Sequence, residues 1–381
     1  MLEHRNIHDT LYGLAAFVIL GNAVLYLDTI PILRWGVSIL RVLSVAYAFA
    51  VALPRLRFGR FTSMVGLFYL VAGIFTYIHN GAIHDWVSNT LNSMGIALII
   101  YLSMLRSPRQ TIIMLARIFD SLICINFILT LLYPSGIFDG SYLLGFNRNS
   151  VGPPLFCGLI VHNFAYRLKQ RTWFTYLLIG VISIITLIRV GSMTSVVGCV
   201  LLLAFSFVPF ERLRKAALAI FFVFYILFQA AVVYFQADIS SNRHAVFFVE
   251  EVLKKDMTFT RRTFVWKDSH ELIQKSPITG YGMRDSQWFQ QKVVYKSAHN
   301  IIYQILIYGG YILLFIFVCI IISSVARAAK YQSILSLYAM YGVCVFFFMM
   351  IMESYNLALI FLLLELCYYS SEFSDTETDN L

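Results

Sequence analysis

The sequence has few charged residues for its length. Asp, Glu, Lys and Arg together make up 13% of the 381 residues, whereas soluble domains usually carry about 25%. So few charged side chains cannot cover the surface of a soluble protein, which excludes a soluble enzyme. A disordered chain is excluded as well, because aromatic residues are abundant, at 16%.

Patterns typical of metal and disulfide sites are also missing. The sequence contains no Cys-x-x-Cys and no His-x-x-His. Each cysteine falls inside an apolar run, where cysteine behaves as a small hydrophobic residue. We therefore expect neither a disulfide framework nor a metal site. The six cysteines are Cys124, Cys157, Cys199, Cys319, Cys344 and Cys367.

Apolar residues, by contrast, make up 59% of the sequence and gather in long runs. A membrane-spanning helix needs about 20 mostly apolar residues. Twelve runs approach this length, so the sequence predicts an all-α polytopic membrane protein with about twelve transmembrane helices. The runs cover residues 11–27, 36–53, 62–78, 90–105, 111–133, 150–166, 174–190, 194–210, 216–236, 299–325, 334–352 and 356–370.

Basic residues predict the orientation of these spans. If the N-terminus is cytoplasmic, the short inner segments hold 14 Lys and Arg, and the short outer segments hold three. Cytoplasmic loops of membrane proteins carry such an excess, so we expect both termini to be cytoplasmic. The same rule accounts for the net charge of +9, and we therefore expect no nucleic acid as a partner.

The segment 237–298, between the ninth and tenth predicted spans, differs from the other loops. It has 62 residues, including ten Lys or Arg and seven Asp or Glu. Apolar residues at helical spacing predict a helix over 262–275, which Pro277 ends, and Gly280 and Gly282 then predict turns. The sequence therefore divides into spans one to nine (1–236), an extracytoplasmic loop (237–298), spans ten to twelve (299–370) and an acidic cytoplasmic tail (371–381).

An ionisable residue inside a predicted span is expected to have a partner or a function, because inserting one into the membrane costs roughly 2.5–3.5 kcal/mol. Arg117 and Asp120 are three residues apart and could pair on one helix face. Glu353 and Glu365 lie near the ends of the last two spans. Two interpretations stay open, namely ion pairs that fix helix packing and a polar cavity for a substrate.

Four polar segments are predicted to meet at the outer face of the membrane. Several of their arginines could bind an anionic group such as phosphate through paired hydrogen bonds. His299 is predicted at a helix start beside water, and histidine suits general-base catalysis. The outer loops contain no Asp-x-Asp pair, which favours a metal-free mechanism. The segments are residues 145–152, 189–195, 258–282 and 297–300.

Each of these features also has an ordinary interpretation. An interfacial histidine such as His299 can be a headgroup contact or a helix cap. Loop arginines are commonly solvated or bound to lipid phosphate, and Trp266 could be an interface anchor. Only the four segments taken together therefore indicate a functional site.

The order and spacing of the motifs resemble the O-antigen polymerase and ligase superfamily, whose members are bacterial membrane glycosyltransferases. The resemblance covers the span pattern over most of the chain and is sharpest over 258–313. One departure is Met193, which stands where the family often has arginine, and Arg189, one helical turn earlier, is the candidate replacement. The matching residues are Arg262, Thr263, Trp266, Pro277, Gly280, Gly282, His299, Asn300, Gly310, Asn147, Asn149 and Gly152.

The resemblance implies polymerisation of lipid-linked repeat units into a surface polysaccharide such as O-antigen, capsule or exopolysaccharide. Glycosyl transfer from polyprenyl diphosphate would take place at the outer face of the bacterial cytoplasmic membrane, without a metal or other cofactor. His299 is the predicted general base, and Arg262 and Arg189 are predicted to bind the diphosphate. Further predicted substrate-binding residues are Arg261, Arg148, Arg243, Arg284, Asn149, Asn300 and Trp266.

Two alternatives to a polymerase stay open. A ligase of the same fold would move the finished glycan to a lipid A core or another acceptor, and its donor chemistry is the same. A flippase or transporter would instead have a hydrated central cavity with charges at mid-depth. The expected partners are the polyprenyl-diphosphate-linked oligosaccharide, the lipid bilayer, and a chain-length regulator and a flippase of the same pathway.

Overall fold

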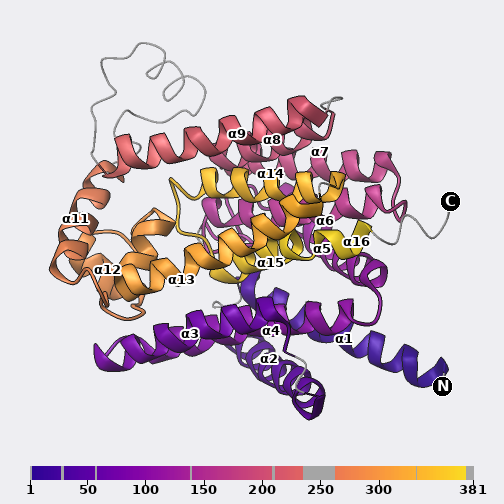
Figure 1. Ribbon diagram of the computed structural model, residues 1–381, viewed down its shortest axis with the longest axis horizontal. Helices are drawn as coiled ribbons and strands as arrows, with labels where there is room; N and C mark the ends of the chain where they lie inside the picture. Colours follow the sequence, from indigo (N-terminus) through magenta and orange to yellow (C-terminus); the bar gives the residue numbers. More distant parts are fainter. Residues whose placement is uncertain are drawn as a thin grey trace.

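The computed structural model describes seven stretches of the chain, and their regular structure is helical (Figure 1). Outside the helices, these stretches contain one isolated β-bridge, between Tyr142 and Gly145. The all-α class predicted from the sequence is confirmed. The described stretches are residues 2–26, 30–55, 58–137, 140–207, 211–234, 262–331 and 333–374.

Each of the twelve apolar ranges predicted to span the membrane overlaps a helix of the described residues. The helices and helical turns are α1 (Leu2–Val24), α2 (Pro31–Ala52), η1 (Leu53–Arg55), α3 (Arg60–Ile78), α4 (Ile83–Met104), α5 (Pro108–Leu132), η2 (Arg148–Val151), α6 (Gly152–Arg167), α7 (Trp173–Val190), α8 (Met193–Phe207), α9 (Glu211–Phe228), η3 (Gln229–Tyr234), α11 (Arg262–Lys275), α12 (Ser286–Val293), α13 (Ile301–Tyr331), α14 (Ile334–Met349), α15 (Leu357–Tyr368) and α16 (Ser370–Ser374). Six of them, α2, α3, α4, α5, α7 and α13, are long and apolar enough to cross a membrane. The protein is therefore a multi-pass membrane protein, and the number of twelve spans stays a prediction.

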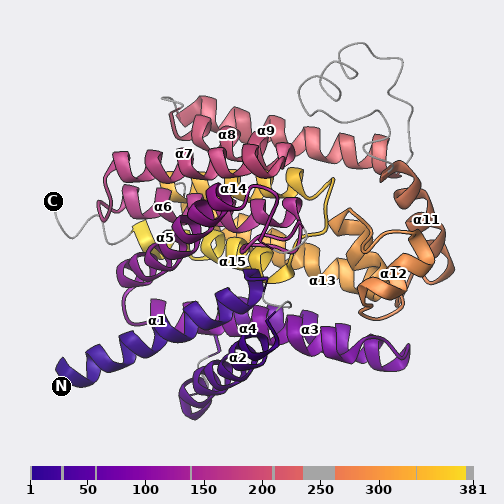
Figure 2. The ribbon, with the colours of Figure 1, turned by 180° about the vertical axis from the view of Figure 1, so that it is seen from behind.

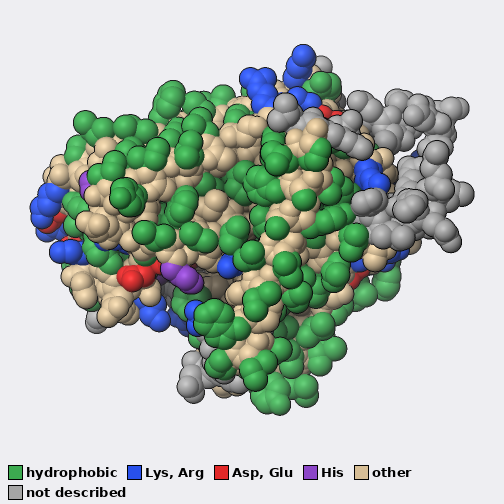
Figure 3. Space-filling view, turned by 90° about the horizontal axis from the view of Figure 1, so that it is seen from below, with side chains coloured by type: hydrophobic (Ala, Val, Ile, Leu, Met, Phe, Trp, Pro, Cys, Tyr) green, Lys and Arg blue, Asp and Glu red, His purple; other side chains and the backbone are tan. Residues whose placement is uncertain are grey.

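Most of the long helices run along the longest axis of the molecule (Figures 1 and 2). The short helices α11 and α12 lie at one end of this axis, and α16 and the start of α1 lie at the other. On the face formed by α1 to α4, hydrophobic side chains cover most of the middle, whereas most charged side chains lie toward the edges (Figure 3). Such a surface fits an apolar bilayer between two polar ends.

Three helices, α6, α14 and α15, form the centre of the bundle. Nearly all their residues are buried, as expected for helices that are apolar on every face. α6 packs against α5, α7, α8, α14 and α15, and α14 also contacts α8, α9 and α13. The segment that joins α14 to α15 lies toward the end of the molecule where α11 and α12 lie (Figure 1), and the side chain of Asn300 donates to its Ile351 carbonyl at 3.2 Å.

The turn after α11 fills a kink in α13. Helix α13 is interrupted at Gly309 and Gly310, and the turn supplies partners to the interrupted backbone. The N–H of Tyr281 donates to the carbonyl of Ile307 at 2.7 Å, and the N–H of Tyr311 donates to the carbonyl of Pro277 at 2.8 Å. The predicted helix over 262–275 and the turn after Pro277 are both confirmed, and they lock α11 onto α13.

The predicted pairing of Arg117 with Asp120 is wrong. The carboxylate of Asp120 instead contacts the ring of His162, at 2.7 Å between Nε2 and Oδ1, and the guanidinium of Arg171. These partners come from α6 and from the turn before α7, so packing between helices decided the pairing. All six cysteines are free in the structure.

Candidate functional site

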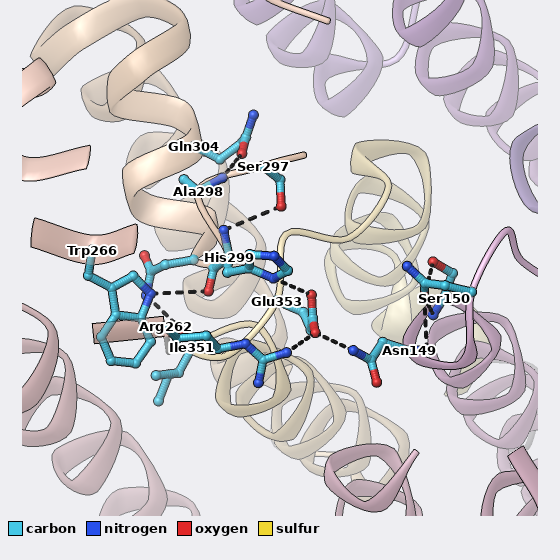
Figure 4. Close-up of polar contacts among 12 residues, drawn as sticks. Asn149, Ser150, Arg262, Trp266, Ser297, Ala298, His299, Gln304, Ile351 and Glu353 are labelled. Atoms are coloured by element: carbon cyan, nitrogen blue, oxygen red, sulfur yellow. Dashed lines mark hydrogen bonds and ion pairs between the residues drawn. The ribbon is translucent and has the colours of Figure 1, made fainter. Parts of the chain in front are cut away.

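Glu353 is the centre of a polar cluster in the segment between α14 and α15 (Figure 4). Its Oε1 accepts a hydrogen bond from Nδ2 of Asn149 at 2.6 Å and forms an ion pair with the guanidinium of Arg262. Its Oε2 lies 2.9 Å from Nδ1 of His299. One carboxylate thus joins three of the four polar segments that the sequence predicted to meet.

Each partner of Glu353 is positioned by local structure. Arg262 is the first residue of α11. Asn149 lies in the turn η2, where Oδ1 of Asn147 accepts from the N–H groups of Asn149 and Ser150, both at 2.9 Å. Such side-chain caps are typical of Asn before a helical turn. His299 lies just before α13, two residues ahead of its first residue.

His299 has an unusual backbone conformation. Its φ angle is +47°, a value that costs about 1–3 kcal/mol for a residue other than glycine. The indole Nε1 of Trp266 donates to the carbonyl of His299 at 3.3 Å, and the ring of Tyr295 meets the imidazole edge-on at 5.4 Å. These contacts hold the imidazole toward Glu353 (Figure 4).

The imidazole of His299 lines a cavity of about 740 Å³. Amide, hydroxyl and aromatic side chains make up most of its wall, a composition that suits the hydroxyl groups and apolar faces of sugar rings. Lys296 is the only Lys or Arg among the described residues of the wall, and its Nζ lies 5.7 Å from the ring centre of Phe146. The lining residues are Tyr26, Phe146, Asn147, Asn149, Ser150, Ser286, Gln290, Val294, Tyr295, Lys296, Ser297, His299, Glu353, Ser354 and Tyr355.

A smaller cavity of about 200 Å³ adjoins the first one. Much of its wall is apolar and comes from the C-terminal end of α1, the start of α6 and the start of α15. Tyr355 lines both cavities. Burial raises the pKa of the Tyr355 hydroxyl well above its ordinary value.

The arginines predicted to bind the diphosphate lie in different environments. Arg262 is buried and paired with Glu353, whereas Arg189 and Arg148 are exposed. Nη1 of Arg148 lies 4.0 Å from the position that a Cβ on Gly191 would take, so the segments 145–152 and 189–195 adjoin. Two predicted substrate-binding residues lie outside the described residues, Arg243 and Arg261.

Two other predicted substrate-binding residues make contacts with the fold. The guanidinium of Arg284 donates to the carbonyls of His79 at 2.6 Å and Asn80 at 3.0 Å, at the C-terminal end of α3. Asn300 is buried, and its Oδ1 accepts from the N–H of Tyr303 at 3.1 Å. It thereby caps the start of α13. Neither residue is among those that line the larger cavity.

Sequence reasoning missed two residues of this site. Glu353 was noted only as a charge near the end of a span, and the cost of burying that charge was the signal that it has partners. Lys296 was not singled out, although it stands three residues before His299. Among the described residues, no group of three or more His, Cys, Asp or Glu could hold a metal ion.

Comparison with known proteins agrees with the motifs. Residues 178–318 match the family model described as O-Antigen ligase. This range runs from α7 into α13 and includes Arg189, Arg262, Trp266 and His299. No curated protein matches the sequence. The family match confirms the resemblance of this chain to the O-antigen polymerase and ligase superfamily.

Proposed function

We propose that the protein polymerises lipid-linked oligosaccharide repeat units by glycosyl transfer from a polyprenyl diphosphate. The observation that carries this proposal is His299, which lines the larger cavity and has one ring nitrogen on the carboxylate of Glu353. Since Nδ1 contacts Glu353, the remaining nitrogen, Nε2, is the atom that can accept a proton. A histidine so placed can act as a general base.

The reaction joins a sugar hydroxyl of the acceptor to the anomeric carbon of the donor. The acceptor O–H gives its proton to Nε2 of His299, and its oxygen forms the new glycosidic bond. The bond between the anomeric carbon and the phosphate oxygen breaks, and polyprenyl diphosphate leaves with the electron pair. The leaving diphosphate gains negative charge, so cationic side chains near it stabilise the transition state.

Cations at or near the cavity support the placement of the diphosphate. Lys296 lies on the wall, and Arg148 and Arg189 belong to the adjoining segments. We propose that Arg262 binds the diphosphate through the guanidinium N–H groups that Glu353 leaves free, because Glu353 contacts only its Nη2. We place the first isoprene units of the lipid in the smaller cavity beside Tyr355, where Leu25, Leu144 and Leu359 supply apolar wall.

The setting proposed for this reaction follows from the sequence. The segment 237–298 would face the extracytoplasmic side of the bacterial cytoplasmic membrane, with both termini in the cytoplasm, as the distribution of Lys and Arg predicts. The repeat units would arrive through a flippase, and a chain-length regulator would set the polymer length. We also propose that no metal takes part, so transfer by the purified protein should continue in EDTA.

The test is a strain that lacks this gene and is complemented with the wild type, His299→Ala or His84→Ala. The His84 side chain is 82% exposed and serves as the matched control. We expect a ladder of long glycan chains from the wild type and His84→Ala, and none from His299→Ala at a normal level of the protein in the membrane. Long polymers in the His299→Ala strain would refute the mechanism. Because a flippase does not need His299 as a base, that outcome would favour a flippase.

A ligase is the second candidate, because the matching family model is described as O-Antigen ligase. It would use the same donor and the same base, but a different acceptor. The strain without the gene separates the two functions by the glycan that accumulates. Single repeat units on the surface indicate loss of a polymerase, whereas long chains that are not attached to an acceptor indicate loss of a ligase.

A further inference from the structure

We infer that Glu353 is a positioning residue that fixes the proton of His299 on Nδ1 and so presents the lone pair of Nε2 to the acceptor hydroxyl. This inference rests on the proposed function, since it explains how the proposed base is oriented. It assigns to the segment between α14 and α15 a part in the reaction, although this segment lies outside the range that matches the family model.

The two oxygens of Glu353 have different partners. Oε1 is occupied by two donors, the guanidinium of Arg262 and the amide nitrogen of Asn149. Oε2 faces Nδ1 of His299 at 2.9 Å. An ionised carboxylate only accepts hydrogen bonds, and an arginine in contact with it stabilises the charged form. Nδ1 must therefore carry a proton, which leaves the neutral ring with its lone pair on Nε2.

The same contact helps after the proton has moved. Once Nε2 has taken the acceptor proton, the imidazolium faces a carboxylate across one hydrogen bond, and this stabilises the new positive charge. The positive φ of His299 and the bond from Trp266 to its carbonyl hold the ring in place for this contact. The base is thus assembled from α11, the start of α13 and the segment that carries Glu353 (Figure 4).

The amide of Glu353→Gln has only one orientation that suits its neighbours. Arg262 and Asn149 both donate to the Oε1 position, so the amide oxygen must lie there, and the NH₂ group must then face Nδ1 of His299. Nδ1 can pair with an NH₂ group only by accepting, which moves the ring proton to Nε2. The variant therefore changes the tautomer of His299 while it keeps the size of the side chain and the hydrogen bonds from Arg262 and Asn149. It also removes the charge opposite Arg262, so the thermal unfolding temperature is measured beside the rate to show that the variant is folded.

The first measurement is steady-state transfer by purified protein in lipid vesicles, with a polyprenyl-diphosphate-linked oligosaccharide as substrate. We expect Glu353→Gln to lower kcat by roughly 100- to 1,000-fold, within the range of general-base effects, with little change in KM. Glu353→Asp keeps a carboxylate and should retain more activity than Glu353→Gln. Glu372→Gln is the matched control, because its carboxylate pairs with Arg327 at the other end of the molecule, and it should transfer at the wild-type rate.

The second measurement reports the tautomer directly. Nitrogen-15 spectra of histidine-labelled protein distinguish the two tautomers, and the signals of His299 are identified by their loss in His299→Ala. We expect a proton on Nδ1 in the wild type and on Nε2 in Glu353→Gln. A proton on Nε2 in the wild type, or the same tautomer in both proteins, would overturn the inference.

A double variant separates positioning from a purely structural role. If Glu353 acts through His299, then Glu353→Gln should not lower the residual rate of His299→Ala any further. A further loss of the order seen in the wild-type background would assign Glu353 to structure and overturn the inference. Transfer at the wild-type rate by the single variant His299→Ala would instead refute the proposed function. This outcome differs from those that refute only the role of Glu353.

Discussion

The guanidinium of Arg262 forms a buried ion pair with the carboxylate of Glu353, although the sequence predicted Arg262 on the diphosphate of the substrate. Both side chains are at most 10% exposed. A charge held in this way contributes to the assembly of the site before any substrate binds. Its replacement should therefore affect the stability of the protein, and not only its activity.

Arg262→Gln leaves the carboxylate of Glu353 without its cation, and removal of one partner of a buried pair costs roughly 3–5 kcal/mol. We expect a clear fall in the thermal unfolding temperature of the purified protein in detergent. Arg189→Gln, at an exposed position, should unfold at nearly the wild-type temperature. Equal unfolding temperatures for both variants would show that the ion pair does not stabilise the fold.

Lys296→Ala removes the one Lys or Arg among the described residues of the cavity wall. We expect KM for the lipid diphosphate donor to rise about three- to tenfold, which corresponds to about 1 kcal/mol of binding, with a smaller change in kcat. Lys296→Arg should bind the donor nearly as well as the wild type. The control is Lys292→Ala in α12, which is exposed and does not line the cavity; an equal rise in KM in this variant would argue against a specific contact.

Gly310→Ala tests the junction between the outer turn and α13. Gly310 has a φ of +59°, and a Cβ there would lie 2.3 Å from the carbonyl carbon and oxygen of Ile278. With its ψ of −158°, Gly310 lies in a backbone region that is essentially restricted to glycine; this conformation alone costs roughly 1–3 kcal/mol for alanine, and the overlap adds to this. We expect a lower unfolding temperature and less transfer, because His299 lies just before the same helix.

Gly36→Ala is the control for that variant. Gly36 lies inside α2, and a Cβ there would meet nothing within 4 Å. Alanine inside a helix is more favourable than glycine by roughly 0.5–1 kcal/mol, so this protein should be at least as stable as the wild type. If Gly36→Ala and Gly310→Ala unfold alike, the close approach of Ile278 to α13 is not important for stability.

The sequence alone predicted the features that depend on local composition. The scarcity of charge and the long apolar runs predicted an all-helical membrane protein, since a bilayer requires such segments to form helices. The helix over 262–275 and the turn with Gly280 were predicted because Pro277 and the helical spacing of apolar residues act over a few residues only. His299 and Asn149 were also found from their motifs.

Only the tertiary structure decided how the polar residues pair. Asn149, Arg262, His299 and Glu353 come from four separate parts of the chain, and their contacts depend on how α6, α11, α13 and α14 pack. A charged residue inside an apolar run indicates that it needs a partner. The sequence does not indicate which of several arginines is that partner. Asp120 shows the same limit, because its partners lie in α6 and beside α7 and not in its own helix.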